Sequence, residues 1–237
     1  MEEYVKYGRF YPTLFGMLIP FLLTFFMFGD KLENTLSIIN KFTSYVGVFV
    51  MSSAFYGCIG YYLREISRDI SKLLFQFPLF KEDETEMPTT EMLLWKNEKI
   101  SDDYHNSIAD KVYKQFHIHL LTPEEERADL NKAKRLIVDA VGQMRNATRH
   151  DKMLLQYNYE FGFCRNYMGA SCISLLIIII LMIMSCYLDL QPVSWFISAL
   201  IVQILLAIGA FMMLKLRARD YAKQLLRSFC SLENKLD

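Results

Sequence analysis

The chain has 237 residues with 26 basic and 26 acidic side chains, so its formal net charge is zero, and 53% of its residues are hydrophobic. Its five cysteines are odd in number and scattered, which is not the spacing of a metal site or of a disulfide framework. The sequence also lacks a glycine-rich phosphate loop, a His-Glu-x-x-His motif and a nucleophile elbow. We therefore expect neither an enzyme nor a bound cofactor.

Two apolar runs occupy the N-terminal part of the chain, at residues 11–28 and 42–62, and neither contains Asp, Glu, Lys or Arg. A helix needs roughly 20 apolar residues to cross the hydrocarbon core, where open backbone groups find no partner, so each run is predicted to be a spanning helix. For the shorter first run, which contains Pro12 and Pro20, a buried helix of a soluble core is the alternative. A cleaved signal peptide is disfavoured because the chain starts with Glu2-Glu3 rather than with basic residues.

The segment 63–166 is charged and is predicted to be mostly helical. Helical spacing of apolar residues continues from the second run to about residue 75. Pro88 disfavours helix before it, so we expect Thr89 or Thr90 to cap a short helix over 91–95.

Two clearer helix starts follow in the same segment. Ser101 is the expected cap of an amphipathic helix over 101–116. The run Thr122-Pro123-Glu124-Glu125 has the pattern of a capping box with proline at the first helical position. That helix is predicted to extend to about residue 149, with a break near 128–131.

A second pair of uncharged apolar runs lies at residues 167–188 and 194–214. The run at 167–188 is nearly all aliphatic, so we expect it to form the lipid-facing shell, with Ile178 among its lipid-facing residues. The sequence therefore predicts an all-α membrane protein with four transmembrane helices, arranged as two hairpins that flank a mainly helical cytoplasmic domain. The predicted parts are an N-terminal transmembrane hairpin (1–62), a cytoplasmic helical domain (63–166), a C-terminal transmembrane hairpin (167–214) and a cytoplasmic tail (215–237).

The orientation follows from lysine and arginine, because loops rich in these residues stay in the cytoplasm. The connection 29–41 has two basic residues offset by Asp30 and Glu33, and the turn 189–193 has none. The segment 63–166 has sixteen of the 26 basic residues, and the tail after Leu214 has six more. We expect both termini and the middle domain to lie in the cytoplasm.

The spans contain few polar side chains. The second span has small residues, and its Ser53–Gly57 step lets helices approach closely; the alternatives are ordinary helix packing and a water-filled path. Gln203 in the fourth span should face protein or water rather than lipid. No span contains an ionisable carboxylate or base, which disfavours an ion-coupled transporter. The predicted pore or packing residues are Ser52, Ser53, Gly57, Gly60 and Gln203.

His117 and His119 alternate along the chain, so in an extended segment both rings could reach one metal ion. The preferred interpretation places them at a helix end or core edge, because no cysteine is near and the other two histidines lie in separate segments. We expect no metal site.

An ordered series of motifs lies in the segment from about 60 to 170: Met87-Pro88-Thr89-Thr90, Tyr104-His105, Thr122-Pro123-Glu124-Glu125-Glu126, Thr148-Arg149, and Tyr159-Glu160-Phe161-Gly162-Phe163-Cys164-Arg165-Asn166 with Gly169. With this series the segment resembles a bacterial four-span family that includes the membrane effector of the Hailong antiphage system. Glu86 and Cys164 depart from the family pattern, which has a glycine and an arginine there.

The resemblance implies a homotetrameric ion channel in the bacterial inner membrane, acting in abortive infection. It also implies a partner nucleotidyltransferase, whose short single-stranded DNA product holds the channel closed until infection removes it. Phosphates of such a ligand would need clustered arginine and lysine. The alternative role of the same residues is to face anionic membrane lipids. The candidate ligand residues form a basic collar: Arg145, Arg149, Lys152, Arg165, Arg64 and Arg68.

Two functional classes therefore remain open. One is an oligomeric channel gated by its cytoplasmic domain. The other is a membrane-anchored sensor or scaffold whose cytoplasmic domain binds a partner protein without conducting ions. Passage of ions through the purified protein would distinguish them.

Overall fold

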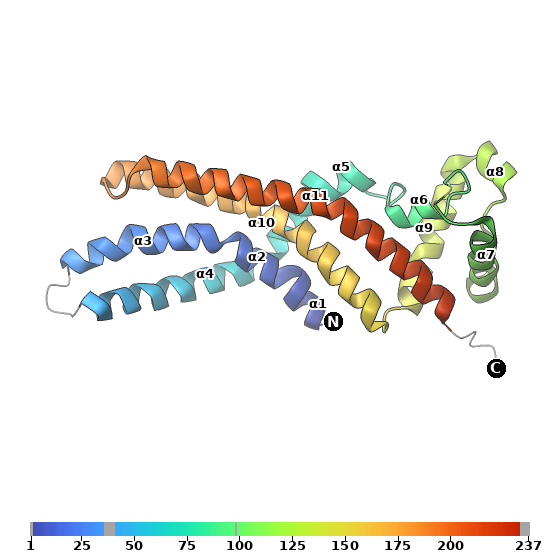
Figure 1. The fold of residues 1–237 in the computed structure, drawn as a ribbon, viewed down its shortest axis with the longest axis horizontal. Helices are drawn as coiled ribbons and strands as arrows, with labels where there is room; N and C mark the ends of the chain where they lie inside the picture. The colour runs from blue at the N-terminus through green and yellow to red at the C-terminus, as the bar shows by residue number, and fades with distance from the viewer. Residues whose placement is uncertain (1, 36–40, 98, 233–237) are drawn as a thin grey trace. The chain divides into compact units, whose positions relative to one another are not determined.

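The computed structural model describes residues 2–35, 41–97 and 99–232, and every regular element in these ranges is helical. The chain divides into two compact units. Unit 1 comprises Met1–Leu74 and Gly162–Met213, and unit 2 comprises Phe75–Phe161 and Leu214–Asp237. Two long helices, α10 (Lys152–Leu188) and α11 (Val193–Ser231), contribute residues to both units (Figure 1).

The N-terminal segment of unit 1 is an almost continuous helix in four pieces: α1 (Glu2–Val5), the π-helical turn η1 (Lys6–Phe10), α2 (Tyr11–Gly16) and α3 (Leu18–Thr35). Prolines explain its interruptions, since each removes a backbone donor. Pro12 cannot donate to the Gly8 carbonyl four residues earlier, and Asn166 Nδ2 donates to that carbonyl instead. The freed backbone acceptor therefore connects this segment to α10.

The second span belongs to α4 (Lys41–Ser71), which continues through the π-helical turn η2 (Lys72–Gln76) into α5 (Phe77–Phe80). The expected continuation of this helix beyond the second apolar run is confirmed, and it extends to Phe80 rather than to residue 75. In Figure 1, α3 and α4 lie side by side.

Four helical stretches within the described ranges are long and apolar enough to cross a membrane: Glu3–Phe28, Val46–Phe80, Lys152–Leu188 and Val193–Ser231. The prediction of four spanning helices is confirmed by length and composition. The grouping of these helices into two hairpins around a cytoplasmic domain stays a prediction.

An apolar cluster joins α3, α10 and α11 in unit 1, formed by Leu23, Met27, Ile178, Leu181 and Phe196. Ile178 is fully buried in it, so the expectation that this residue faces lipid is wrong. The third span contacts the first span, and an aliphatic sequence did not reveal this because packed and lipid-facing positions have the same composition. In the most apolar 18-residue segment of each span, 11% of the residues are buried in the fourth span and 39% in the first. The fourth span is therefore less covered by the rest of the chain than the first.

Besides the parts of α10 and α11, the described residues of unit 2 form α5 and four further helices: α6 (Pro88–Met92), α7 (Asp102–Phe116), α8 (Pro123–Ala128) and α9 (Leu130–Ala147). Ser101 caps α7, and Thr122 forms the predicted capping box with Glu125. The break between α8 and α9 is also confirmed, and Asp129 caps the second helix there.

The predicted cap at Thr89 or Thr90 is wrong. The helix α6 starts at Pro88, with Met87 as its N-cap in an extended conformation. Pro88 therefore occupies the first helical position, which proline tolerates because its missing N–H would have no helical partner there. Thr89 and Thr90 lie buried inside the helix, where the Thr90 hydroxyl donates to the Glu84 carbonyl at 2.9 Å.

The core of unit 2 is built from α7, α9 and the C-terminal part of α11. The residues after Leu214, predicted to be a separate tail, contribute five buried side chains to this core, as many as α9 does. Burying these side chains removes apolar surface from water, which is the main favourable contribution to folding of this unit. Members of the core from these three helices include Ile108, Val112, Ile137, Met144, Leu225 and Phe229.

Candidate functional site

Three residues of the predicted basic collar belong to unit 1, and two of them form ion pairs there. Arg68 lies 2.8 Å from Glu65, and Arg64 lies 3.5 Å from the same carboxylate and 4.2 Å above the Tyr61 ring. Arg9 contacts Glu65 as well, at 3.2 Å. Such shared pairs limit how much free positive charge this end of unit 1 presents.

Arg165, the third collar residue of unit 1, is 8% exposed. Its Nε donates to Asn166 Oδ1 and its Nη2 donates to the Tyr4 hydroxyl, both at 3.2 Å. A buried guanidinium held in this way orients α10 against the N-terminal helix. We assign Arg165 to the structure of unit 1 rather than to an exposed surface.

The other three collar residues belong to unit 2 and differ from one another. Arg145 Nη1 donates to Glu84 Oε2 at 2.6 Å, and its Nε is buried with no hydrogen-bond partner within the described ranges. Arg149 and Lys152 are exposed, and the described residues provide neither with an ion pair. Arg149 Nε donates a hydrogen bond to His150 Nε2 at 3.1 Å. These two collar residues are the ones that a phosphate ligand could reach without breaking an ion pair.

The small residues of the second span also fall into two groups. A Cβ added at Gly60 would lie 2.8 Å from Leu14 Cδ2, so this glycine permits a close helix contact inside unit 1. A Cβ at Gly57 would meet nothing within 4 Å, and Ser53 is exposed. Ser52 is half-buried. The Ser53–Gly57 step is therefore an open face of the single chain.

Gln203 lies at the centre of a buried polar cluster between α10 and α11. Its Nε2 donates to Ser171 Oγ at 2.9 Å, and Ser171 Oγ donates to the Tyr167 carbonyl at 2.9 Å. Gln203 Oε1 and Ser174 Oγ are buried and find no hydrogen-bond partner in the described part of the chain. Gln203 was expected to face protein or water, and it faces protein. The serines at positions 171 and 174 were missed, although their i,i+3 spacing places them on one helix face.

His117 and His119 do not converge on a common site with other ligands. His117 ends α7 in a left-handed conformation with φ of 56°, and both histidines are exposed beside Tyr113. No group of three or more His, Cys, Asp or Glu side chains within the described ranges could hold a metal ion. Their position at a helix end agrees with the preferred interpretation of the sequence.

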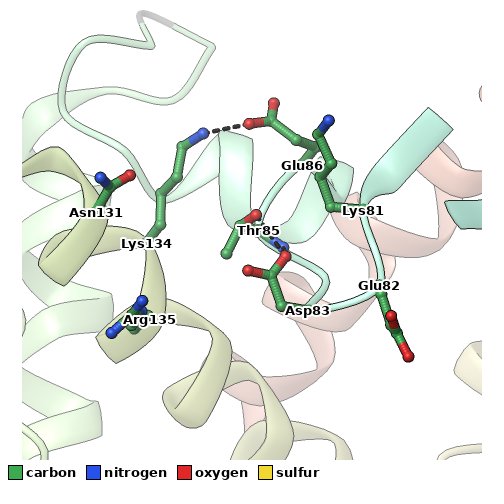
Figure 2. A pocket seen from close by; sticks show the side chains of 8 residues that line it. All are labelled: Lys81, Glu82, Asp83, Thr85, Glu86, Asn131, Lys134 and Arg135. Carbon is green, nitrogen blue, oxygen red and sulfur yellow. Dashed lines mark hydrogen bonds and ion pairs between the residues drawn. The ribbon is translucent and has the colours of Figure 1, made fainter. Parts of the chain in front are cut away.

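A further pocket in unit 2 was not predicted. It lies between the acidic turn, defined here as residues 81–87 joining α5 to α6, and the start of α9, and its volume is about 580 Å³ (Figure 2). Lys134 on α9 forms an ion pair with Glu86 of the turn. The Thr85 hydroxyl donates to Asp83 at 2.7 Å, and this hydrogen bond lowers the pKa of the Asp83 carboxyl. The ion pair between Lys134 and Glu86 joins residues 48 positions apart, so local sequence patterns carry no signal for the pocket.

Comparison with known proteins adds no assignment to these sites. No protein-family model matches the chain, and neither does any curated protein or solved structure. The proposed function therefore depends on the contacts and chemistry of the residues together with the sequence resemblance described above.

Proposed function

We propose that the protein is an oligomeric membrane effector that forms an ion channel gated by unit 2, in which short single-stranded DNA keeps the channel closed during antiphage defence. In this proposal both termini and unit 2 lie in the cytoplasm of a bacterial cell, and four copies enclose the ion path. The ligand, its source in a nucleotidyltransferase and the defence role come from the resemblance described above.

The open face of the second span is the observation that carries the channel proposal. Ser53, Ala54 and Gly47 are exposed and Gly57 has free space where a Cβ would be, so small and polar groups point away from the rest of the chain. Lipid tails offer no hydrogen bonds to serine or to bare backbone, whereas a neighbouring helix or water does. Repetition of this face around a symmetry axis would surround a path with small residues and the hydroxyl groups of Ser53.

Flux measurements with purified protein in dye-loaded liposomes test this proposal. We expect ion passage by the parent protein and loss of passage or assembly for Gly57→Leu, because the added side chain would enter the contact between copies. Gly209→Leu is the matched control, since Gly209 in the fourth span also has nothing within 4 Å of its Cβ position. Tolerance of Gly57→Leu together with loss in Gly209→Leu would transfer the path to the fourth span.

The proposed orientation has its own test by cysteine labelling. A cysteine at Asn97 in unit 2 should react only after the membrane is opened, whereas one at Ser37 should react in intact cells. Ser37 lies outside the described residues, so this expectation depends on charge asymmetry alone. Labelling at Asn97 in intact cells would contradict the orientation.

The ligand part of the proposal is tested with Arg149 and Lys152. Replacing both by Gln should weaken binding of a short single-stranded oligonucleotide and reduce the salt dependence of its affinity, because each phosphate contact releases a counterion. Arg145 is left unchanged because its loss would also break the contact with Glu84. If the ligand holds the channel closed, the double variant should be more toxic to its host. If the double variant binds the oligonucleotide normally and is not toxic, Arg149 and Lys152 do not bind the ligand, and contact with anionic lipids is the remaining role.

The alternative function is a membrane-anchored scaffold. The observation that favours it is the separate apolar core of unit 2, which gives this unit the means to present a binding surface without any ion path. Folded, oligomeric protein that passes no ions in liposomes with or without oligonucleotide would support the scaffold over the channel.

A further inference from the structure

The pocket beside the acidic turn has cationic side chains, the volume of a small-molecule site, and a carboxylate, Glu86, that already occupies one of the cations. Three cationic side chains line it, from Lys81 on the turn and from Lys134 and Arg135 on α9. Asn131, one helical turn before Lys134, adds an amide that can donate hydrogen bonds. Its volume of about 580 Å³ lies in the range of sites for small molecules.

The three cations are not equally engaged. Lys134 is paired with Glu86, as the dashed line in Figure 2 shows, and its side chain is largely covered. Neither Lys81 nor Arg135 forms an ion pair or a side-chain hydrogen bond with any described residue. Arg135 is near enough to Asp83 to favour the charged carboxylate. Two cations are therefore available at once, and a third becomes available if Glu86 leaves Lys134.

The carboxylates of the turn act as an internal substitute for an anion. Figure 2 shows the Glu86 carboxylate reaching Lys134, and Glu82 and Asp83 also line the pocket. The same turn is fixed to α9 a second time, through Glu84 and Arg145 at 2.6 Å. An arriving anion would compete with Glu86 for Lys134 while the Glu84 contact keeps the turn in place.

The backbone of the turn indicates that this arrangement is held against local preference. Lys81 has φ of 62° and ψ of 158°, and Glu84 has φ of 59°. Side chains other than glycine rarely adopt such conformations unless surrounding contacts impose them. Hydrogen bonds to the Glu84 carbonyl hold this backbone, from the Met87 N–H at 3.1 Å and from the Thr90 hydroxyl at 2.9 Å. Because these bonds do not involve the Glu86 side chain, the turn can keep its backbone conformation when an anion displaces Glu86 from Lys134.

We propose that this pocket binds a small, multiply charged anion of the phosphate-ester or polyphosphate class, which displaces Glu86 from Lys134. Arginine and lysine together with an amide donor suit the oxygens of such an anion. The proposal goes beyond the channel function, because the same site could serve a scaffold, and it is tested by binding rather than by ion flux.

Titration calorimetry of the full-length protein in detergent with inorganic pyrophosphate, at low ionic strength, tests the site. We expect saturable binding that weakens at least tenfold in Lys134→Gln and in Arg135→Gln. Glu86→Gln should bind pyrophosphate several-fold more tightly, because the internal competitor loses its charge. A gain of affinity cannot arise from misfolding, so tighter binding by Glu86→Gln would show that the weaker binding of the other variants is not caused by unfolding.

Two controls define the result that would overturn the proposal. Lys132→Gln removes an exposed charge from the same helix outside the pocket lining, and it should leave the affinity unchanged. The Arg149 and Lys152 double variant should also bind pyrophosphate normally, which separates this pocket from the oligonucleotide proposal. Absence of binding, equal weakening by Lys132→Gln, or weaker binding in Glu86→Gln would each refute the site.

Discussion

Polar side chains make up a larger share of the buried residues in unit 1 than in unit 2. In unit 1 the fully buried residues include Gln203, Asn166 and Ser171, whereas large apolar side chains such as Leu205 and Met212 are exposed. In unit 2 the buried residues are mainly apolar, with Met144 and Phe229 fully covered. The difference is the one expected between a solvent of lipid tails and water: lipid rewards exposed apolar groups and gives polar groups no partner.

Polar groups in unit 1 consequently connect helices rather than cover the surface. The Ser71 hydroxyl donates to the Arg165 carbonyl, and the Tyr56 hydroxyl donates to the Pro20 carbonyl at 3.1 Å. Helices that make such contacts must approach closely, which requires small residues where they cross. Gly169 is the extreme case, because a Cβ there would lie 1.9 Å from the Ser67 carbonyl oxygen.

The largest effect is expected for Gly169→Ala. The added methyl group would overlap a backbone oxygen of α4, which cannot move aside as a flexible side chain would, so we expect an exceptional loss of more than about 5 kcal/mol in unfolding free energy. Thermal unfolding and size-exclusion profiles in detergent measure it.

Gly209→Ala is the control for this substitution in the same unit. Its Cβ would meet nothing within 4 Å, and alanine is favoured over glycine in a helix by about 1 kcal/mol, so this variant should be unchanged or slightly more stable. If both variants behaved alike, close backbone approach between α4 and α10 would not be what holds unit 1 together.

A smaller loss is expected for Phe229→Ala in unit 2. Phe229 is fully buried and stacks on Phe116 with ring centroids 5.7 Å apart. Truncation leaves a cavity in the apolar core and should cost about 3–5 kcal/mol when the core cannot collapse, with less if α7 moves inward. Hydrogen exchange of α7 amides, with exposed Lys223→Ala as control, would locate the effect. Unchanged protection of α7 would mean that the C-terminal part of α11 is dispensable for unit 2.

Local signals in the sequence accounted for much of the fold. The four spans follow from uncharged apolar runs, because no other local pattern fits a helix in lipid. The caps at Ser101 and Thr122 were predictable because a cap and its partners lie within four residues. The choice between Pro88 and the following threonines was also local, but two capping rules competed there and the preference of proline for the first helical position prevailed.

Contacts between distant residues could not be predicted. Glu84 and Arg145 are 61 positions apart, and nothing in either neighbourhood indicates that the acidic turn lies on α9. Burial of Ile178 likewise depends on which spans are neighbours, which hydropathy does not encode. Arg145 and Arg165 are of the residue type expected in a phosphate-binding site, yet each donates a hydrogen bond to a residue of its own unit.

The smallest effect is expected for Asp151 in unit 2, whose contribution to stability should depend on pH. Asp151 precedes α10 in unit 2 and accepts hydrogen bonds from the backbone N–H groups of Met153 at 2.8 Å and Leu154 at 3.1 Å. A hydrogen bond with the Ser228 hydroxyl is the main cause that lowers the pKa of the Asp151 carboxyl below its ordinary value of 3.8. Asp151→Ala should cost about 1 kcal/mol at neutral pH, the usual value of a helix cap.

The direction of the pH dependence follows from that lowered pKa. The folded protein binds the proton less readily than the unfolded chain, so the contribution of Asp151 is complete above pH 3.8 and is lost as the pH falls through the folded-state pKa. The difference in melting temperature between the parent and Asp151→Ala should therefore narrow below about pH 4. Asp151→Asn keeps a capping oxygen and has no charge to lose, so it should retain most of the stability. Gln203→Leu in unit 1 removes a group that does not titrate, so its effect should be constant over the same pH range. An equal narrowing for both variants would mean that acid acts on the whole protein rather than on the cap that unit 2 exposes to water.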